Sequence, residues 1–466
     1  MPITSHIFLL LFVPLTVGAY YWLTKTPRQK MFFLLAVGYL FYALAGLNML
    51  PVLLGLSLVT FWAGRTNRTT IGILLNLAAL LLFKYWNFGI ENINLILSSL
   101  QLESTLGLLK LGLPLGLSFF TFKHIGYLLD LQQKRYQPSS DFWAFAAFSA
   151  YFPQISAGPI SNYRETSVQF DKLPERLSND QRVSSLIYIS LGLAKKILIA
   201  DTIGELLASS VNQVGGFSGL IPAWYLVIAY AAQLYFDFSG YTDLTLGVSS
   251  LFGIRLPQNF NNPYLAANPG EFWERWHMSL STWFRYYLFF PLSRYYLRKF
   301  GSEKRERAQY TANLITMSLV GLWHGAGWNF ILWGFYHGVY LNIGAWRKQK
   351  NLAIPNFVER GFFLLAILLG WALFMGSSMD YLVHLFKQLF GFGGLGSLEL
   401  ITSLVKDNSF LALIFGIPIA FSGLTEAHNL EDRIRGRGVS LALLGAVAAL
   451  CILLIDKASG FIYIQF

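Results

Sequence analysis

The feature that most constrains this chain is a long stretch without charge, from Thr311 to Trp346, which contains no Asp, Glu, Lys or Arg. One helical crossing of a bilayer needs only about 20 apolar residues, at about 1.5 Å of rise per residue. The stretch is longer than that, and Gly325 and Gly327 weaken the helix near its middle. We therefore expect two apolar segments that meet at a break, and the break carries His324.

The position of His324 has two interpretations. Irregular backbone at membrane depth persists only where it is buried in protein or lines a wet cavity, and a titratable residue there is a candidate for function. The alternative is a core histidine that packs among Trp323, Trp328 and Trp333. Spacing alone leaves both interpretations open.

Composition indicates that the solvent of this chain is a bilayer. Of its 466 residues, 55% are hydrophobic and 13% are charged, whereas soluble proteins average about 25% charged residues. Aromatic residues make up 17%, which is typical of side chains that sit at membrane interfaces. We expect an all-α polytopic integral membrane protein that forms a single domain over residues 1–466.

Charge and cysteine content exclude several classes of function. The net charge of +11 is spread over loops and forms no single basic tract, so cytoplasmic bias and anionic lipid explain it and nucleic acid does not. Cys451 is the only cysteine. An internal disulfide and a thiolate metal cluster are therefore excluded, and we expect no bound metal or cofactor.

Lysines within apolar segments need their own interpretation, because a charge at membrane depth is costly. Lys195 and Lys196 lie near the centre of a span predicted over 183–207. They mark either the cytoplasmic mouth of a cavity or the point where the helix leaves the bilayer. We interpret Lys123 and His124 as an interfacial pair close to lipid headgroups.

Two carboxylates lie in the apolar segment 222–250. Asp237 and Asp243 are six residues apart, and this spacing does not place them on one face of a helix. We therefore expect a helix-breaking turn near an interface at this point, and no acid/base pair.

The segment after residue 268 predicts an amphipathic helix with one aromatic face. Asn268 and Pro269 suit its first turn. The spacing i, i+3, i+4, i+7, i+11 then places five side chains on one face and His277 inward: Trp273, Trp276, His277, Leu280 and Phe284. Basic runs at 294–307 and 347–350 are cytoplasmic by the positive-inside rule. The His324 segment therefore begins and ends on one side of the membrane, or is re-entrant.

Six stretches together resemble the membrane-bound O-acyltransferase (MBOAT) superfamily, and its bacterial alginate O-acetyltransferase branch in particular. The two strongest are Arg275-Trp-His-Met-Ser-Leu-Ser-Thr-Trp-Phe-Arg285 and Gly321-Leu-Trp-His-Gly-Ala-Gly-Trp-Asn-Phe330. The others lie, in the family's order, at 113–122, 152–159, 235–243 and 461–466. The resemblance implies roughly ten to twelve transmembrane helices, with interfacial or re-entrant helices, around a central tunnel.

The resemblance also implies roles for individual residues. His324 matches the family's catalytic histidine, and His277 matches a second histidine held near the tunnel. We expect both to face one internal cavity that opens to the cytoplasm near 294–307 or near Lys195. The residues expected to line the tunnel or bind substrate are Trp276, Arg285, Trp323, Trp328, Asn329 and Tyr463.

One departure from the family pattern concerns Arg285. The family usually continues this motif with Arg-Asp-Tyr, but here Tyr286 and Tyr287 follow Arg285. The arginine therefore lacks its expected carboxylate neighbour, which leaves alginate less firmly assigned as the acceptor. The same branch includes relatives that act on peptidoglycan, cellulose and teichoic acid.

The activity that the resemblance implies is O-acetyl transfer across a bacterial inner membrane. Acetyl-CoA in the cytoplasm would be the donor, and an alginate-like exopolysaccharide would be acetylated through a separate extracytoplasmic SGNH-hydrolase-like partner. Imidazole suits a general base because its pKa lies near neutrality. Two other classes remain possible, a polytopic transporter or flippase and a scaffold of a secretion complex, but the halves of the chain show no repeat of the kind that transporters have.

Overall fold

The computed structural model describes residues 2–102, 105–208, 218–352, 354–376, 378–397, 416–417, 419–420, 426–434 and 438–455. Helices dominate these residues, and no strand occurs among them, so the prediction of an all-α protein is confirmed there. The chain forms two compact units, Met1–Arg182 with Val248–Pro257, and Val183–Gly247 with Gln258–Phe466. The single domain over 1–466 stays a prediction.

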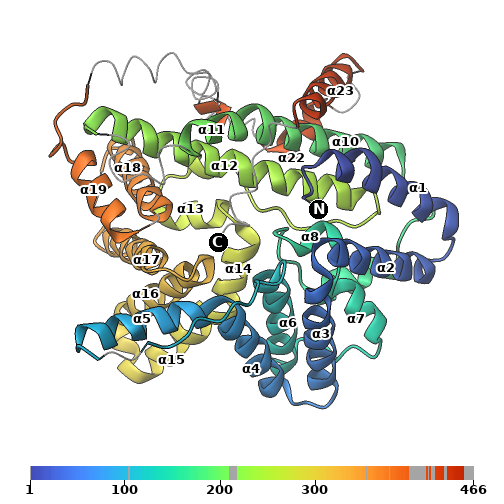
Figure 1. Ribbon diagram of the computed structural model, residues 1–466, viewed down its shortest axis with the longest axis horizontal. Helices are drawn as coiled ribbons and strands as arrows, with labels where there is room; N and C mark the ends of the chain where they lie inside the picture. The colour runs from blue at the N-terminus through green and yellow to red at the C-terminus, as the bar shows by residue number, and fades with distance from the viewer. Residues whose placement is uncertain are drawn as a thin grey trace. The chain divides into compact units, whose positions relative to one another are not determined.

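The first unit carries the helices drawn from blue to teal in Figure 1. Their bounds are η1 Ile7–Phe12, α1 Val13–Leu23, α2 Pro27–Gly46, η2 Leu47–Met49, α3 Leu50–Arg65, α4 Thr69–Leu80, η3 Leu81–Tyr85, α5 Trp86–Ser99, α6 Leu117–Gln132, α7 Phe142–Ser149, α8 Phe152–Ile155 and α9 Tyr163–Phe170.

The second unit contains the remaining helices, apart from the first residues of α10 and the last residues of α12. Their bounds are α10 Asn179–Leu193, η4 Ala194–Asp201, α11 Thr202–Ala208, α12 Leu220–Ser250, η5 Pro263–Leu265, α13 Pro269–Arg275, α14 Met278–Phe284, η6 Arg285–Phe289, α15 Phe290–Phe300, η7 Ser302–Lys304, α16 Arg305–His324, α17 Trp328–Gln349, α18 Asn356–Met375, α19 Met379–Leu389, α22 Ala427–Ile434 and α23 Gly438–Leu453.

The protein is embedded in a membrane, and four helical stretches among the described residues are long and apolar enough to cross one. They are Pro27–Arg65, Thr69–Ser99, Asn179–Glu205 and Asn356–Met375. Two shorter apolar helical stretches, Ile7–Leu23 and Gly438–Leu453, accompany them. The larger number of spans that the family resemblance implies stays a prediction.

The first unit buries His124 and Lys123 in a polar network, so their interpretation as an interfacial pair is wrong. Nδ1 of His124 lies 3.2 Å from Oδ1 of Asn76, and its Nε2 lies 2.7 Å from Oγ of Ser149. The ammonium of Lys123 donates to the Phe148 carbonyl and, over 3.2 Å, to Oε1 of Gln154. Each side chain has partners inside the protein, so neither needs to reach the headgroups.

The second unit buries Lys195 and Lys196 against carboxylates of α12. Lys195 Nζ lies 2.6 Å from an oxygen of Asp243, and Lys196 Nζ lies 2.7 Å from oxygens of Asp237 and Asp201. The lysines therefore mark neither a cavity mouth nor a helix end. The turn predicted at Asp237 is also wrong, because α12 continues through it as a helix.

A glycine contact explains how η4 and α12 come close enough for these ion pairs. A Cβ on Gly240 would lie 3.1 Å from the Lys196 nitrogen of the main chain, and one on Gly192 would lie 2.7 Å from the Gly240 carbonyl oxygen. The two backbones therefore pack directly against each other. The six-residue spacing of Asp237 and Asp243 therefore does not prevent ion pairing, because each carboxylate contacts a different lysine of η4.

The charge-free stretch folds as predicted into two helices that meet at a break. Helix α16 ends at His324 and α17 begins at Trp328, and the two lie side by side (Figure 1). Small residues allow this contact, since a Cβ on Gly334 would lie 2.1 Å from the Met317 carbonyl oxygen. The hairpin therefore brings the end of α16 to the start of α17 inside the second unit.

Candidate functional site

His324 is the last residue of α16, and its side chain is buried among aromatic rings. Its ring centroid lies 5.0 Å from that of Trp323, 5.2 Å from that of Trp333 and 5.2 Å from that of Phe374. The C-terminal end of a helix carries partial negative charge, which favours a positive group there. An imidazole in this position can accept a proton while its surroundings exclude water.

Gly325 makes the break after His324 possible. The main chain is extended at this residue, and a Cβ there would lie 2.1 Å from the ring of Phe330. Only a residue without a side chain lets that ring pack over the backbone. Gly325, which predicts a weak helix, therefore also allows the ring of Phe330 to pack closely against the main chain.

His277 lies in a second break, between α13 and α14, with φ 43° and ψ 53°. This left-handed conformation costs a residue with a side chain about 1–2 kcal/mol, and such outliers collect at functional sites. The imidazole is buried, 4.7 Å from the ring of Phe238 between centroids. Burial lowers the pKa of His277 to about 3, so its ring is neutral at physiological pH.

The break at His277 corrects the prediction of one continuous amphipathic helix over this segment. Helix α13 ends at Arg275 because Trp276 is extended, with φ −103° and ψ 129°. The main-chain nitrogen of Asn261 donates to the Arg275 carbonyl over 3.0 Å, and that of Met278 donates to the Asn259 carbonyl over 2.9 Å. These bonds come from a loop that the helical spacing of the segment does not reveal.

Trp323 connects the two predicted histidines. Its ring centroid lies 6.1 Å from that of His277 and is in contact with His324. The structure therefore brings together three of the residues that the sequence singles out, from two separate breaks.

A third histidine, which the sequence analysis missed, lies on the other side of Trp333. The centroid of His337 is 4.9 Å from that of Trp333 and 5.1 Å from that of Trp273. His337 is buried, and neither ring nitrogen has a hydrogen-bond partner among the described residues. Its position four residues after Trp333, within the charge-free stretch, is a signal that could have identified it. These rings form the histidine–tryptophan cluster: Trp273, His277, Trp323, His324, Trp333 and His337.

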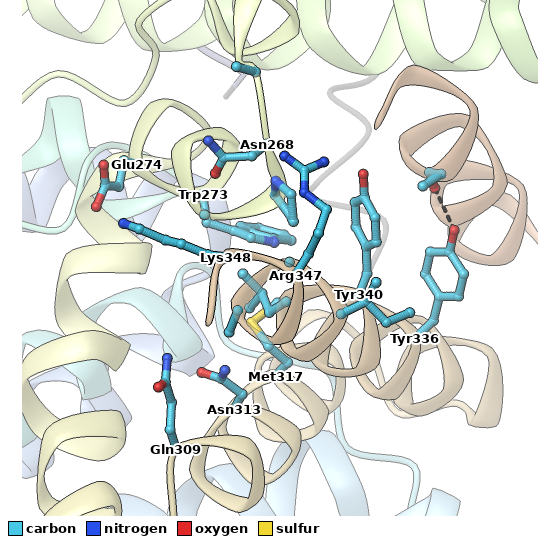
Figure 2. A pocket seen from close by; sticks show the side chains of 18 of the residues that line it. Asn268, Trp273, Glu274, Gln309, Asn313, Met317, Tyr336, Tyr340, Arg347 and Lys348 are labelled. Atoms are coloured by element: carbon cyan, nitrogen blue, oxygen red, sulfur yellow. Dashed lines mark hydrogen bonds between the residues drawn. The ribbon is translucent and has the colours of Figure 1, made fainter. Parts of the chain in front are cut away.

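A cavity of about 980 Å³ lies beside this cluster and is lined by residues of α13, α14, α16, α17 and α18. Figure 2 shows Trp273 in its wall together with Arg347 and Lys348. Neither His277 nor His324 lines it. Trp273 connects the cavity to the cluster, since its ring centroid lies 5.7 Å from that of Trp333.

The charges of the cavity come in part from an expected residue, Arg285, and in part from Arg347 and Lys348 at the end of α17. Arg285, Arg347 and Lys348 line it, whereas Lys195 is buried in an ion pair. Arg285 lies 3.0 Å from a carboxylate oxygen of Glu274, so it has an acidic neighbour from α13 in place of the one missing from its motif. Arg347 pairs with Glu359 at 2.5 Å. Lys348 is exposed and forms no ion pair with another described residue.

The other predicted residues have different surroundings. Trp276 is buried, and its ring centroid lies 4.8 Å from that of Trp371. Trp328 begins α17 and is 53% exposed. The side-chain amide of Asn329 donates to the Gly376 carbonyl over 2.9 Å. Tyr463 lies outside the described residues, and the tunnel roles of all four residues stay predictions.

The segment that contains both histidines is similar to a known protein family. The model of the membrane-bound O-acyltransferase family, MBOAT, matches residues 138–378. The "Probable alginate O-acetylase AlgI" of Azotobacter vinelandii is 34% identical over 409 residues, 84% of this chain and 79% of the relative. The protein of the same name from Pseudomonas putida is 33% identical over 443 residues, 92% and 88% of the two chains. The "Peptidoglycan O-acetyltransferase" of Helicobacter pylori is 31% identical over 433 residues, 84% and 80% of the two chains.

Proposed function

This chain belongs to the membrane-bound O-acyltransferase family and is an acyltransferase, and from that premise we propose that it moves an acetyl group from cytoplasmic acetyl-CoA across a bacterial inner membrane. The acetyl group then reaches an alginate-like exopolysaccharide. The observation that carries this proposal is the aromatic enclosure of His324 at the break between α16 and α17.

The donor binds in the cavity beside the histidine–tryptophan cluster. A volume of about 980 Å³ lies at the upper end of the range of small-molecule and cofactor sites. Lys348 and Arg347 supply cations for the phosphates of coenzyme A. The thioester end then points toward Trp273, the residue of the wall that contacts Trp333.

His324 acts as the general base. An acceptor hydroxyl attacks the thioester carbonyl, its oxygen bonds to the acyl carbon, and its proton passes to the imidazole. As the tetrahedral intermediate collapses, the carbon–sulfur bond breaks and the imidazolium returns the proton to the departing thiolate. The end of the α16 dipole stabilises the imidazolium, and the surrounding rings exclude the water that would hydrolyse the thioester.

His277 assists as a neutral imidazole. Because burial holds its pKa at about 3, the ring keeps one N–H donor and one acceptor at neutral pH. The donor is suited to the oxyanion that forms on the thioester carbonyl. Its contact with Trp323, the neighbour of His324, places it near the base.

The identity of the acceptor rests on similarity to other proteins. Two of the relatives described above carry alginate in their names and one carries peptidoglycan. An alginate-like polymer is our choice, and peptidoglycan is the alternative acceptor. Transfer to either polymer is completed by a separate extracytoplasmic hydrolase-like acetyltransferase.

The test measures transfer of labelled acetyl groups from acetyl-CoA in membranes that contain the wild type or His324→Ala, together with polymer acetylation in cells. The substitution should lower transfer by about 100-fold to 10,000-fold, because removal of a general base costs about two to four orders of magnitude. Membrane insertion should not change. Acetyl-CoA consumption by the variant at the wild-type rate would favour the transporter or scaffold classes.

The same assay distinguishes the two acceptors. Alginate-like polymer acetylated in wild-type cells and unmodified in His324→Ala cells supports our choice. If His324→Ala removes acetylation only from peptidoglycan, peptidoglycan is the acceptor instead of the alginate-like polymer, and the proposed acetyl transfer still stands.

A further inference from the structure

His277 occupies the N-cap position of α14 but does not cap that helix. An N-cap side chain usually turns back to accept a hydrogen bond from a first-turn N–H group, and Ser, Thr, Asp and Asn are the residues that do so. The imidazole makes no such bond to α14. It lies against Phe238 instead, with Trp323 beyond it.

Asn259, from a separate loop, supplies the missing cap. Its main-chain oxygen accepts from the nitrogen of Met278 over 2.9 Å. Its side-chain oxygen accepts from the main-chain nitrogen of Ser279 over 3.3 Å and from the Ser279 hydroxyl over 2.6 Å. The first two residues of α14 thereby have acceptors that do not come from residue 277.

The same loop fixes the preceding turn. Asn259 is fully buried, and its amide lies 3.5 Å from the hydroxyl of Thr242 on α12. Two residues later, the main-chain nitrogen of Asn261 donates to the Arg275 carbonyl. The chain around His277 is therefore held from both sides by one loop, which explains how a left-handed histidine persists there.

We propose that Asn259 is a positioning residue for His277. By capping α14 in place of residue 277, it allows a histidine at a position where a capping side chain would otherwise be needed. It also fixes the left-handed conformation that points the imidazole toward Trp323. This inference rests on the proposed function, because it requires a chemical task for His277.

The test is a double-mutant cycle in membranes, with kcat and KM for acetyl-CoA as readouts and thermal melting as the check on folding. Asn259→Ala should lower kcat on the order of 100-fold, the cost of a misplaced group, while KM stays within about twofold. Asn261→Ala is the matched control: its side chain is exposed and its main-chain bond to Arg275 survives, so kcat should not change.

The cycle is completed by His277→Gly, because glycine tolerates the left-handed region and removes the imidazole without adding a side chain that could cap α14. In that background Asn259→Ala should lower kcat no further, since no imidazole remains to be positioned. A kcat that Asn259→Ala leaves at the wild-type value, or lowers by the same factor in both backgrounds, overturns the inference.

One further variant, and comparison with His324→Ala, keep the outcome decisive. If Asn259→Ala does not fold, Ser279→Ala removes only the hydroxyl bond, and kcat should fall by roughly threefold to tenfold; an unchanged kcat overturns the inference. If His277→Gly is fully active while His324→Ala is inactive, the positioning role fails and the proposed acetyl transfer stands. If His324→Ala is active, the proposed function itself fails.

Discussion

Two fully buried histidines in this molecule have opposite surroundings. His124, in the first unit, has a side-chain partner at each ring nitrogen, Asn76 at one and Ser149 at the other. His337, in the second unit, lies among tryptophan rings, and neither of its nitrogens has a hydrogen-bond partner among the described residues. Burial alone therefore does not distinguish a structural histidine from a candidate for chemistry; the partners of the ring nitrogens do.

The difference also bears on His324. An imidazole with both nitrogens engaged by neighbouring side chains has little capacity left for a substrate, and any proton it takes disturbs a network. The ring of His324 lies among aromatic rings, with the centroids of Trp323, Trp333 and Phe374 at 5.0, 5.2 and 5.2 Å from its own. His324 therefore lies in an aromatic enclosure, whereas His124 lies in a polar network.

The largest expected effect on stability comes from removing the ring nitrogens of His124. His124→Phe keeps a ring but removes the partner of the Asn76 side-chain oxygen and leaves the Ser149 hydroxyl with Ser57 alone. A buried group left without its partner costs about 1–3 kcal/mol, so the free energy of unfolding should fall by about that amount. Thermal melting of the detergent-solubilised protein measures this. A variant as stable as the wild type would show that the network contributes nothing.

The matched substitution His337→Phe should behave differently. It removes two nitrogens that have no hydrogen-bond partner among the described residues and keeps the ring contacts with Trp273 and Trp333. The free energy of unfolding should stay within about 1 kcal/mol of the wild type, or rise by that amount. Thermal melting of this variant alongside His124→Phe measures the change. If both variants lose the same free energy of unfolding, the partners of the ring nitrogens do not distinguish His124 from His337.

The smallest effect is expected at the edge of the cavity, where a charge is exposed rather than buried. Lys348→Ala should raise KM for acetyl-CoA by roughly threefold to tenfold with kcat unchanged, because one cation near the coenzyme A phosphates is lost. The effect should shrink as salt is raised. Lys350→Ala is the control, since Lys350 is exposed and does not line the cavity. If Lys350→Ala raises KM as much as Lys348→Ala does, the donor does not bind in this cavity.

The sequence predicts features that depend on nearby residues. The glycines after His324 indicate the break between α16 and α17, and the break lies where they predict it. The motif around His277 indicates a buried histidine, and the structure buries it. In both places the local chain contains the cause: a residue that weakens a helix, or an apolar spacing.

Features that depend on distant partners could not be predicted in this way. The helix predicted through Trp276 is interrupted because Asn259 and Asn261 bond to the turn from another loop. Lys195 seemed to need water because its carboxylate partner Asp243 lies on α12, 48 residues further along the chain. His337 was missed because its significance comes from ring contacts with α13, which spacing within α17 does not show.

The ion pair between Lys195 and Asp243 has a consequence for how the protein is made. The ribosome delivers Lys195 well before Asp243, so the lysine leaves the insertion machinery ahead of its counterion. A lone lysine at the centre of a span opposes partitioning into lipid by about 2.5–3.5 kcal/mol. The helical stretch Asn179–Glu205 therefore gains its full preference for lipid only once α12 has been translated. Pairing with Asp243 then removes the isolated charge of Lys195 from this stretch.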